Sequence, residues 1–499
     1  MDNNAANTRN GGNGRNGQIR ITYYPSCATP GTYTIGATGT YTSITSVTNA
    51  FRNCTLTGSY IFEFQASYIS TAVETFPINF TAFAGSSTTN TLTFRPAAGL
   101  TSFITSSNAV GTINLNGATN IIFDGRSAGL GTTKNLNIYN TNNAGAAVIF
   151  SNGAANNAIK YCTIKGQNNN ATNGVVLFST STGAAGNNSN TIDNSEISST
   201  STTVSATNGI YSAGTAGKLN MLNTISNSNI IDIFNSGAKS VGILMEANTS
   251  EWTINANSIY QTPTRTSSST LEAIEINNKT NGSGHTISNN FIGGLFIGAT
   301  GTGVMTFTGS GYFAGISIYG AIGAANVVSG NTVRNFTITC NARNIHSGIY
   351  HSDGTANITN NIIGDSTTTN SIQFNSSAPT VSFVSPAFTG ICGGGGYTPG
   401  TVGGNVNIQN NVVGSIQSNA TGGTGANEVR AIFYQGSNSL VDISNNFIGG
   451  NLTNSIYNSG NGATVGIVIN SGFTTTAHTV KNNLVRNFAS FNKIGRAHV

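Results

Sequence analysis

One stretch of sequence decides the fold: Thr286-Ile287-Ser288-Asn289-Asn290-Phe291-Ile292-Gly293-Gly294. It predicts a short strand, a two-residue asparagine corner and a second short strand, because a branched aliphatic stands on each side of the Asn pair. The same frame, an Ile or Val followed five positions later by another, recurs along the chain. The ten pairs are Ile159/Ile164, Ile192/Ile197, Ile225/Ile230, Ile254/Ile259, Ile287/Ile292, Val328/Val333, Ile358/Ile363, Ile408/Val413, Ile443/Ile448 and Val480/Val485. Ten copies at similar spacing indicate an internal repeat.

A third strand precedes each asparagine-corner pair, and in it a Gly or Ala stands directly before an Ile or Val. These dipeptides are Ala147-Val148, Gly174-Val175, Gly209-Ile210, Gly242-Ile243, Ala273-Ile274, Gly315-Ile316, Gly348-Ile349, Gly390-Ile391, Ala431-Ile432 and Gly466-Ile467. Three short strands with one inward aliphatic each cannot form a core alone, so successive coils must stack. We therefore expect an all-β, single-stranded parallel β-helix of about ten or more three-strand coils, rising ~4.8 Å per coil.

The composition agrees with a folded chain of strands and turns. Only 7% of the 499 residues are charged and 62 are Gly, yet 37% are hydrophobic and recur at regular intervals. The net charge of +5 is spread thinly, without the basic stripe that nucleic-acid binding requires. No apolar run approaches the ~18 residues of a membrane span. We expect neither nucleic acid nor membrane as a partner.

The chain is expected to divide into four regions. Residues 1–18 are polar and predict a disordered tail, and residues 19–60 predict an N-terminal cap that covers the open end of the stack. The cap holds one short helix, because Ile44, Val47 and Phe51 follow helical spacing after a Thr or Ser cap. Residues 61–488 predict the β-helix, and 489–499 predict a truncated end. Two long loops are expected at Gly293–Tyr312 and Gly364–Thr389, where repeat length varies.

These repeats resemble the right-handed parallel β-helix superfamily of pectate-lyase-like proteins, including its asparagine ladder. Phe123-Asp124-Gly125-Arg126 and Tyr161-Cys162-Thr163-Ile164-Lys165-Gly166 also resemble segments of secreted bacterial surface proteins. That second resemblance implies a type IX sorting domain, which this sequence does not contain. Residues 494–499 resemble a translated sequencing adapter, so we expect the natural chain to continue differently.

The five cysteines carry no metal-binding spacing, and we expect no metal and no cofactor. Cys27 and Cys54 bracket one short segment. The sequence leaves open whether they form a disulfide, which would indicate an oxidising compartment, or remain two reduced buried thiols.

Two segments match catalytic motifs in sequence but lack the structural context that catalysis requires. Gly125-Arg126-Ser127-Ala128-Gly129 matches G-x-S-x-G, but no helix follows to form a nucleophile elbow. His351-Ser352-Asp353 contains the residue types of a catalytic triad, but adjacent residues cannot adopt triad geometry among themselves. We interpret both as turn or strand-end segments.

The outward side of the Gly/Ala-Ile/Val strands is the better candidate site. If each aliphatic points inward, the next residue points outward and so does the one two positions later. The two predicted columns are Tyr211, Leu244, Glu275, Ser317, Tyr350, Cys392 and Phe433, and beside them Glu246, Asn277, Tyr319, Ser352, Gln435 and Asn470. Glu246 and Glu275 are the candidate catalytic pair, because paired carboxylates cleave glycosidic bonds. Tyr211, Asn277, Tyr319, Tyr350 and Asp353 are the candidate ligand-binding residues.

Two functions fit these observations. The first is a secreted or cell-surface, noncatalytic and monomeric β-helix protein that acts in adhesion or contacts a polysaccharide or cell-surface glycan. The second is a polysaccharide hydrolase or lyase whose groove lies on the same sheet. The predicted columns show no Arg or Lys, which counts against a lyase.

Overall fold

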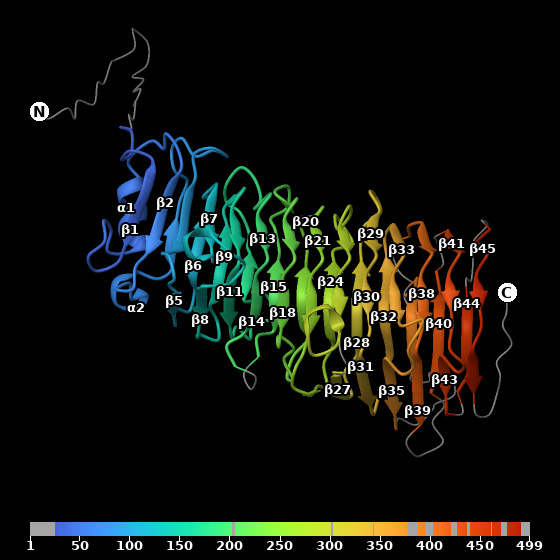
Figure 1. The fold of residues 1–499 in the computed structure, drawn as a ribbon. Helices are drawn as coiled ribbons and strands as arrows, with labels where there is room; N and C mark the ends of the chain where they lie inside the picture. Colours follow the sequence, from blue (N-terminus) through green and yellow to red (C-terminus); the bar gives the residue numbers. More distant parts are fainter. Residues whose placement is uncertain are drawn as a thin grey trace, which may run out of the picture.

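The computed structural model describes residues 25–201, 205–300, 303–342, 344–377, 387–394, 403–420, 427–436, 440–460, 462–470 and 477–490. Their strands run across a long rod, from the N-terminal cap at one end to the last coils at the other (Figure 1). The predicted tail at 1–18 and the adapter-like residues 494–499 lie outside the described residues.

The fold is the predicted right-handed parallel β-helix. Each coil passes through sheet 1, then sheet 2, then sheet 3, and the next coil begins again in sheet 1. From β23 onward a fourth sheet lies between sheets 2 and 3 in the chain. Every strand pairing in the four sheets is parallel, which is the arrangement that stacking of coils requires.

Sheet 1 contains fourteen strands within the described residues. In order along the rod they are β1 (Gly31–Ile35), β2 (Tyr60–Phe64), β4 (Leu92–Pro96), β7 (Ile121–Asp124), β10 (Ala158–Lys160), β13 (Thr191–Asp193), β17 (Thr224–Ser226), β21 (Thr253–Asn255), β25 (Thr286–Ser288), β29 (Asn326–Ser329), β33 (Ala356–Thr359), β37 (Val406–Gln409), β41 (Val441–Ser444) and β45 (Thr479–Lys481).

Sheet 2 follows it around each corner. Its strands are β5 (Ser102–Ser106), β8 (Leu136–Asn140), β11 (Cys162–Gly166), β14 (Glu196–Ser199), β18 (Asn229–Ile231), β22 (Ser258–Tyr260), β26 (Phe291–Ile292), β30 (Thr332–Val333), β34 (Ile362–Gly364), β38 (Val412–Gly414), β42 (Phe447–Ile448) and β46 (Leu484–Val485).

Sheet 3 carries the Gly/Ala-Ile/Val strands. They are β3 (Ile78–Phe80), β6 (Gly111–Asn116), β9 (Ala146–Ser151), β12 (Val176–Phe178), β15 (Asn208–Ser212), β19 (Ser240–Met245), β24 (Leu271–Asn277), β28 (Phe313–Tyr319), β32 (Ile345–Asp353), β36 (Ala387–Gly393), β40 (Glu428–Tyr434) and β44 (Thr464–Ile469).

Sheet 4 is confined to the second half of the rod. Its strands are β23 (Arg265–Thr266), β27 (Met305–Gly309), β31 (Phe336–Cys340), β35 (Ile372–Ser376), β39 (Ile416–Ala420), β43 (Ile456–Asn458) and β47 (Phe488–Ser490). The remaining elements are helices α1 (Ile44–Phe51) and α2 (Ser70–Val73), the 3-10 turns Ser127–Gly129 and Ile297–Ala299, and the short pair β16 (Asn220–Met221) and β20 (Thr249–Ser250).

The aliphatic anchors stack on one another in the interior. Ile254 pairs with Ile287, and Ile287 pairs with Val328, so each lies directly above the next. The side chains of these residues are fully buried. Fully burying such a side chain contributes roughly 1.5–3 kcal/mol, and every coil adds one anchor per sheet. The rod is therefore stabilised by contacts between neighbouring coils.

The two residues of each asparagine corner have different structural roles. The first adopts a left-handed backbone, as Asn289, Asn360 and Asn410 do with φ of 55°, 57° and 57°. The second points inward and forms the asparagine ladder, which comprises Asn257, Asn290, Asn331, Asn361, Asn411, Asn446 and Asn483. At one step, the backbone N–H and the side-chain amide of Asn331 both donate to Asn361 Oδ1, each at 3.0 Å. The ladder thus satisfies the buried polar groups of these corners, while at the two preceding corners the hydroxyls of Ser195 and Ser228 are the acceptors.

The cap closes the first end of the stack. Ser43 caps α1 in a reciprocal capping box with Ser46, and α1 buries Ile44, Val47 and Phe51. Strand β1 pairs in parallel with β2, so the cap continues sheet 1. The structure joins Cys27 and Cys54 in a disulfide.

Two expectations about the repeats were wrong. The segments predicted as long loops contain β27 and β35, whose alternating Met305-Thr-Phe307-Thr and Ile372-Gln-Phe374-Asn patterns bury Phe307 and Phe374. These aromatics are core residues of sheet 4 because alternate side chains of a strand face the interior. The anchor of β12 is Val176, which pairs with Val148 and Ile210, and not Val175 as predicted.

The asparagine ladder generates a test of stability. We expect Asn361→Ala to lower the free energy of unfolding by about 1–3 kcal/mol, because the buried N–H groups of Asn331 lose their acceptor. Urea unfolding followed by circular dichroism measures the change. Its neighbour Asn360 is the matched control: since Asn360 has a positive φ that Gly adopts freely, Asn360→Gly should stay within about 0.5 kcal/mol. Equal losses in both variants would contradict the division of tasks at the corner.

Candidate functional site

A kink shared by the strands of sheet 3 shapes its outer face. Glu272 pairs with Ala314 and Ile274 pairs with Ile316, so Ala273 has no partner between them. The same unpaired position is occupied by Gly242 in β19 and by Gly348 in β32. A Cβ at Gly242 would lie 2.5 Å from the carbonyl oxygen of Ala273, which explains the small residues. The kink turns outward both the residue before it and the residue two positions after it.

Each strand therefore presents an additional outward column that the sequence pattern did not reveal. The predicted column from Tyr211 to Phe433 is present in register. The additional column comprises Asn208, Val241, Glu272, Ala314, Ser347, Thr389 and Arg430. Glu272 and Glu275 thus lie on the same face of β24.

A carboxyl pair and a lysine form the centre of the site. Lys239 Nζ lies 2.6 Å from Glu275 Oε1 and 3.5 Å from Glu272 Oε2. The hydroxyl of Ser317 donates to Glu272 Oε1 at 2.6 Å. Both glutamate side chains are 1% exposed, whereas the lysine side chain is 44% exposed. The lysine therefore covers two buried carboxyl groups and neutralises one negative charge.

The carboxyl group of Glu275 has a raised pKa. Burial, followed by the charge of Glu272 and a hydrogen bond with it, raises the pKa of Glu275 to about 9, against the opposing effect of Lys239. Two carboxylates in one low-dielectric site cannot both ionise easily, so one stays protonated near neutral pH. Burial by itself lowers the pKa of Lys239, but Glu272 and Glu275 outweigh it and raise that pKa above its ordinary value. The lysine remains charged.

Glu246 and Asn277 lie one coil apart at the edge of this centre. Asn277 Nδ2 donates to Glu246 Oε1 at 2.9 Å. Burial is the main cause that raises the pKa of Glu246, and the charge of Glu275 adds to it. Glu246 and Glu275 are neighbours, but the carboxyl that lies with Glu275 against Lys239 belongs to Glu272. Tyr211 packs with Val241 and Leu244 in a separate apolar cluster, and burial followed by the charge of Glu246 raises its pKa to about 12.

Three tyrosines lie beside the carboxyl pair. Tyr319 and Tyr350 come from neighbouring strands with ring centroids 5.5 Å apart, and both are half-buried. Tyr312 meets Tyr350 edge to face at 6.2 Å. Burial, then the charge of Glu272, raises the pKa of Tyr312 and of Tyr319. The rings of Tyr319 and Tyr350 pack against each other at an interplanar angle of 47° and together form a partly exposed aromatic surface on sheet 3.

Asp353 replaces Ser352 in the outward column. The pairing of β28 with β32 shifts between Ile318 and Tyr319, so Tyr319 lies opposite Asp353. This bulge contradicts the predicted place of Ser352, because the inserted residue moves the register by one. Asp353 is fully buried, accepts from Ser352 Oγ at 2.6 Å and lies 2.8 Å from Lys279 Nζ. The aspartate holds the partly exposed lysine beside the tyrosines.

Sequence reasoning missed three members of the site. Lys239 and Lys279 lie in turns outside the strands, and Glu272 required the kink to be recognised. Ser317, which donates to Glu272, was already in the predicted column. The predicted columns contain no Arg or Lys, but Lys239 and Lys279 reach this face from turns. A signal was present for Glu272, since it stands three residues before Glu275 across the small residue Ala273.

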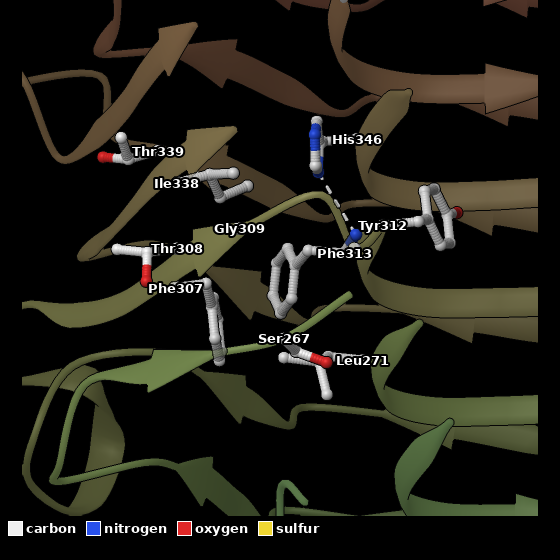
Figure 2. Close-up of a pocket in the computed structure, with 11 residues that line it drawn as sticks. Ser267, Leu271, Phe307, Thr308, Gly309, Tyr312, Phe313, Ile338, Thr339 and His346 are labelled. Atoms are coloured by element: carbon white, nitrogen blue, oxygen red, sulfur yellow. Dashed lines mark hydrogen bonds between the residues drawn. The ribbon is translucent and has the colours of Figure 1, made fainter. Parts of the chain in front are cut away.

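A small cavity lies where sheets 3 and 4 meet, and of the residues of this site only Tyr312 lines it. It measures about 10 Å³ and lies between Phe307, Phe313 and His346 (Figure 2). His346 Nδ1 accepts from the backbone N–H of Phe313 at 3.1 Å, and burial lowers the pKa of His346 to about 3. Such a volume holds about one water molecule, so the neutral histidine is a core residue.

No family model and no curated protein matches the chain. Among solved structures, a PL6 family alginate lyase, AlyGC, has a TM-score of 0.25 at 9% identity over 94% of this chain and 90% of the lyase. A mutant tailspike protein of E. coli bacteriophage HK620, in complex with a hexasaccharide, has a TM-score of 0.22 at 11% identity over 79% and 71%. These scores are too low to bear on function.

No three His, Cys, Asp or Glu side chains among the described residues are placed to share a metal ion. In the same part of the chain, no helix has the length and hydropathy to cross a membrane.

The raised pKa of Glu275 predicts that the stability of the fold depends on pH. Because the folded pKa of Glu275 is raised to about 9 from an ordinary 4.5, the folded chain holds a proton that the unfolded chain releases between these pH values. Folding stability should therefore fall as the pH rises from about 5 to 9. We expect Glu275→Gln, which cannot ionise, to reduce this fall in a series of thermal unfolding midpoints.

The control is Phe103→Ala on sheet 2, which removes no ionisable group and should retain the wild-type slope between pH 5 and 9. Infrared spectroscopy gives an independent measurement, because a protonated buried carboxyl absorbs apart from carboxylates. That band should be present at pH 7 in the wild type and absent in Glu275→Gln. A wild-type spectrum without the band at pH 7 would refute the raised pKa of Glu275.

Proposed function

We propose that this chain is a secreted or surface-displayed protein that binds polysaccharide on the outer face of sheet 3. The observation that carries the proposal is the aromatic surface of Tyr319 and Tyr350, with ring centroids 5.5 Å apart on neighbouring coils. Tyrosine rings offer apolar faces to sugar rings and hydroxyls to their polar groups. Because both rings stand on strands, they are positioned before a ligand arrives.

Polar groups surround this surface in the way that ligand sites require. The Glu246–Asn277 pair flanks one side, and the lysines held by Glu275 and Asp353 remain 44% and 40% exposed. Their ammonium groups and the amide can bond to hydroxyls of a sugar chain that runs along the stacked coils. The disulfide of Cys27 and Cys54 supports an oxidising, extracellular location.

A second candidate is hydrolysis of the bound polysaccharide, and one observation favours it. Glycosidases need one protonated and one ionised carboxyl, and the raised pKa keeps a proton on Glu275 near neutral pH. In this role Glu275 would donate the proton and Glu246 would act as the base or nucleophile. The burial of Glu275 opposes it, because a substrate must first displace Lys239. Binding without turnover is therefore the function that the geometry supports best.

A glycan array with a reducing-end assay tests both candidates. We expect Tyr350→Ala to weaken binding of the recognised polysaccharide roughly tenfold or more, because a ring that stacks on sugar is lost. Phe103→Ala is the matched control, since Phe103 is a 51% exposed aromatic on sheet 2. If no polysaccharide binds, or if both variants bind as the wild type does, the proposed surface is refuted.

Turnover is tested on the same material. We expect no new reducing ends when the wild-type chain is incubated with the polysaccharide that it binds. Release of reducing ends that is lost in Glu275→Gln, while binding is retained, would establish the second candidate in place of the first.

A further inference from the structure

A polar recess lies at the corner between sheets 2 and 4, away from the outer face of sheet 3. It has a volume of about 310 Å³, at the lower end of the ~300–1,000 Å³ typical of ligand sites. Turns from three successive coils form it, before β27, between β30 and β31, and between β34 and β35. The lining residues are Val304, Arg334, Asn335, Asp365, Thr368, Thr369, Asn370 and Ser371.

Arg334 does not have the structural role of its equivalent later in the chain. The motif Val333-Arg334-Asn335-Phe336 recurs as Val485-Arg486-Asn487-Phe488, and each follows a coil with a Phe-Ile-Gly-Gly corner. Arg486 folds back on that preceding coil: its Nε donates to Gly450 O at 3.2 Å, and its guanidinium lies 4.8 Å from the ring of Phe447.

Arg334 instead reaches forward to the next coil. Its NH1 donates to Asp365 Oδ2 at 2.9 Å, and its buried Nε has no hydrogen-bond partner among the described residues. A buried donor without a partner is costly. The ion pair with Asp365 therefore accounts for only part of the hydrogen-bonding capacity of this guanidinium.

Several polar side chains along the same wall are also free. The hydroxyls of Thr368 and Thr369 and the amide of Asn370 make no hydrogen bond within the part of the chain that the structure describes. All three residues are exposed, and Asn370 has a positive φ of 58°. The recess therefore offers hydrogen-bond donors and acceptors on one side and the apolar Val304 on the other.

The charge of the recess disfavours an anionic ligand. Burial by itself raises the pKa of Asp365, but hydrogen bonds from Thr367 and Thr368 and the charge of Arg334 lower it below its ordinary value. The aspartate is ionised and already neutralises the arginine. A ligand carboxylate or phosphate would meet a carboxylate without a free cation among the lining residues. Hydroxyl groups of a neutral ligand can bond to both members of the pair.

We propose that this recess is a second saccharide-binding site, which takes one neutral, hydroxyl-rich sugar unit. The volume suits a single unit better than a chain. Its hydroxyls would meet Arg334, Thr368, Thr369 and Asn370, and its apolar face would lie on Val304. The site is independent of the polysaccharide surface on sheet 3, because the two share no residue.

Ligand-observed NMR titration tests this site, with methyl glycosides of glucose, galactose, mannose and N-acetylglucosamine as probes and galacturonate as the anionic comparison. We expect at least one neutral glycoside to bind. The variant Thr368→Ala/Asn370→Gly should weaken that binding about tenfold, as loss of two hydrogen bonds implies. Gly accepts the positive φ of residue 370, and Thr368 is exposed, so this variant should fold normally.

Two control variants make the result specific. Arg486→Gln removes the equivalent arginine and Tyr350→Ala alters sheet 3, and both should bind the glycoside as the wild type does. Conversely, Thr368→Ala/Asn370→Gly should keep wild-type affinity for any polysaccharide held by sheet 3. The proposal is overturned if no neutral glycoside binds, if galacturonate binds more tightly than the methyl galactoside, or if the double variant binds the glycoside unchanged.

Discussion

Hydrogen bonding between successive corners is the constraint on which the rod depends. Every coil turns sharply between sheets 1 and 2 and buries backbone N–H groups at the turn. A side chain of the neighbouring coil supplies the missing acceptor. In the second half of the rod it is an asparagine, as Asn361 is for Asn331, and at earlier corners it is a serine, as Ser228 is for Ser195. Because each such side chain serves the coil before it, the coils must remain in register. That register in turn places Ile287 over Ile254 and Glu275 beside Lys239.

Much of this architecture was readable from the sequence, since it follows from local and periodic signals. The Ile/Val pairs, the Asn corners and the Gly/Ala-Ile/Val dipeptides each repeat at a spacing that stacking alone explains. Sheet 4 was missed because its strands fall within segments of unequal length. The alternation in Met305–Gly309 was visible, but it does not recur at a fixed distance from the corner.

The candidate site was less readable, for a physical reason. Residues on the face of a strand can be counted from an anchor, and this placed Tyr319 opposite Asn277 and Tyr350 opposite Ser317. Residues in turns cannot be counted in this way. Lys239 reaches the carboxyl pair from a turn, and its position depends on side-chain length and burial. The bulge that puts Asp353 opposite Tyr319 also left no signal in the repeat.

Because of the kink at Ala273 and its equivalents, residues on the outer face of sheet 3 can change while the core residues stay the same. Anchors such as Ile274 and Ile316 point into the interior, while outward residues such as Tyr319 and Tyr350 remain partly exposed. Substitution at a partly exposed outward position can therefore alter recognition with little loss of foldability. A rod of this kind can therefore change its ligands one coil at a time while the interior stays the same.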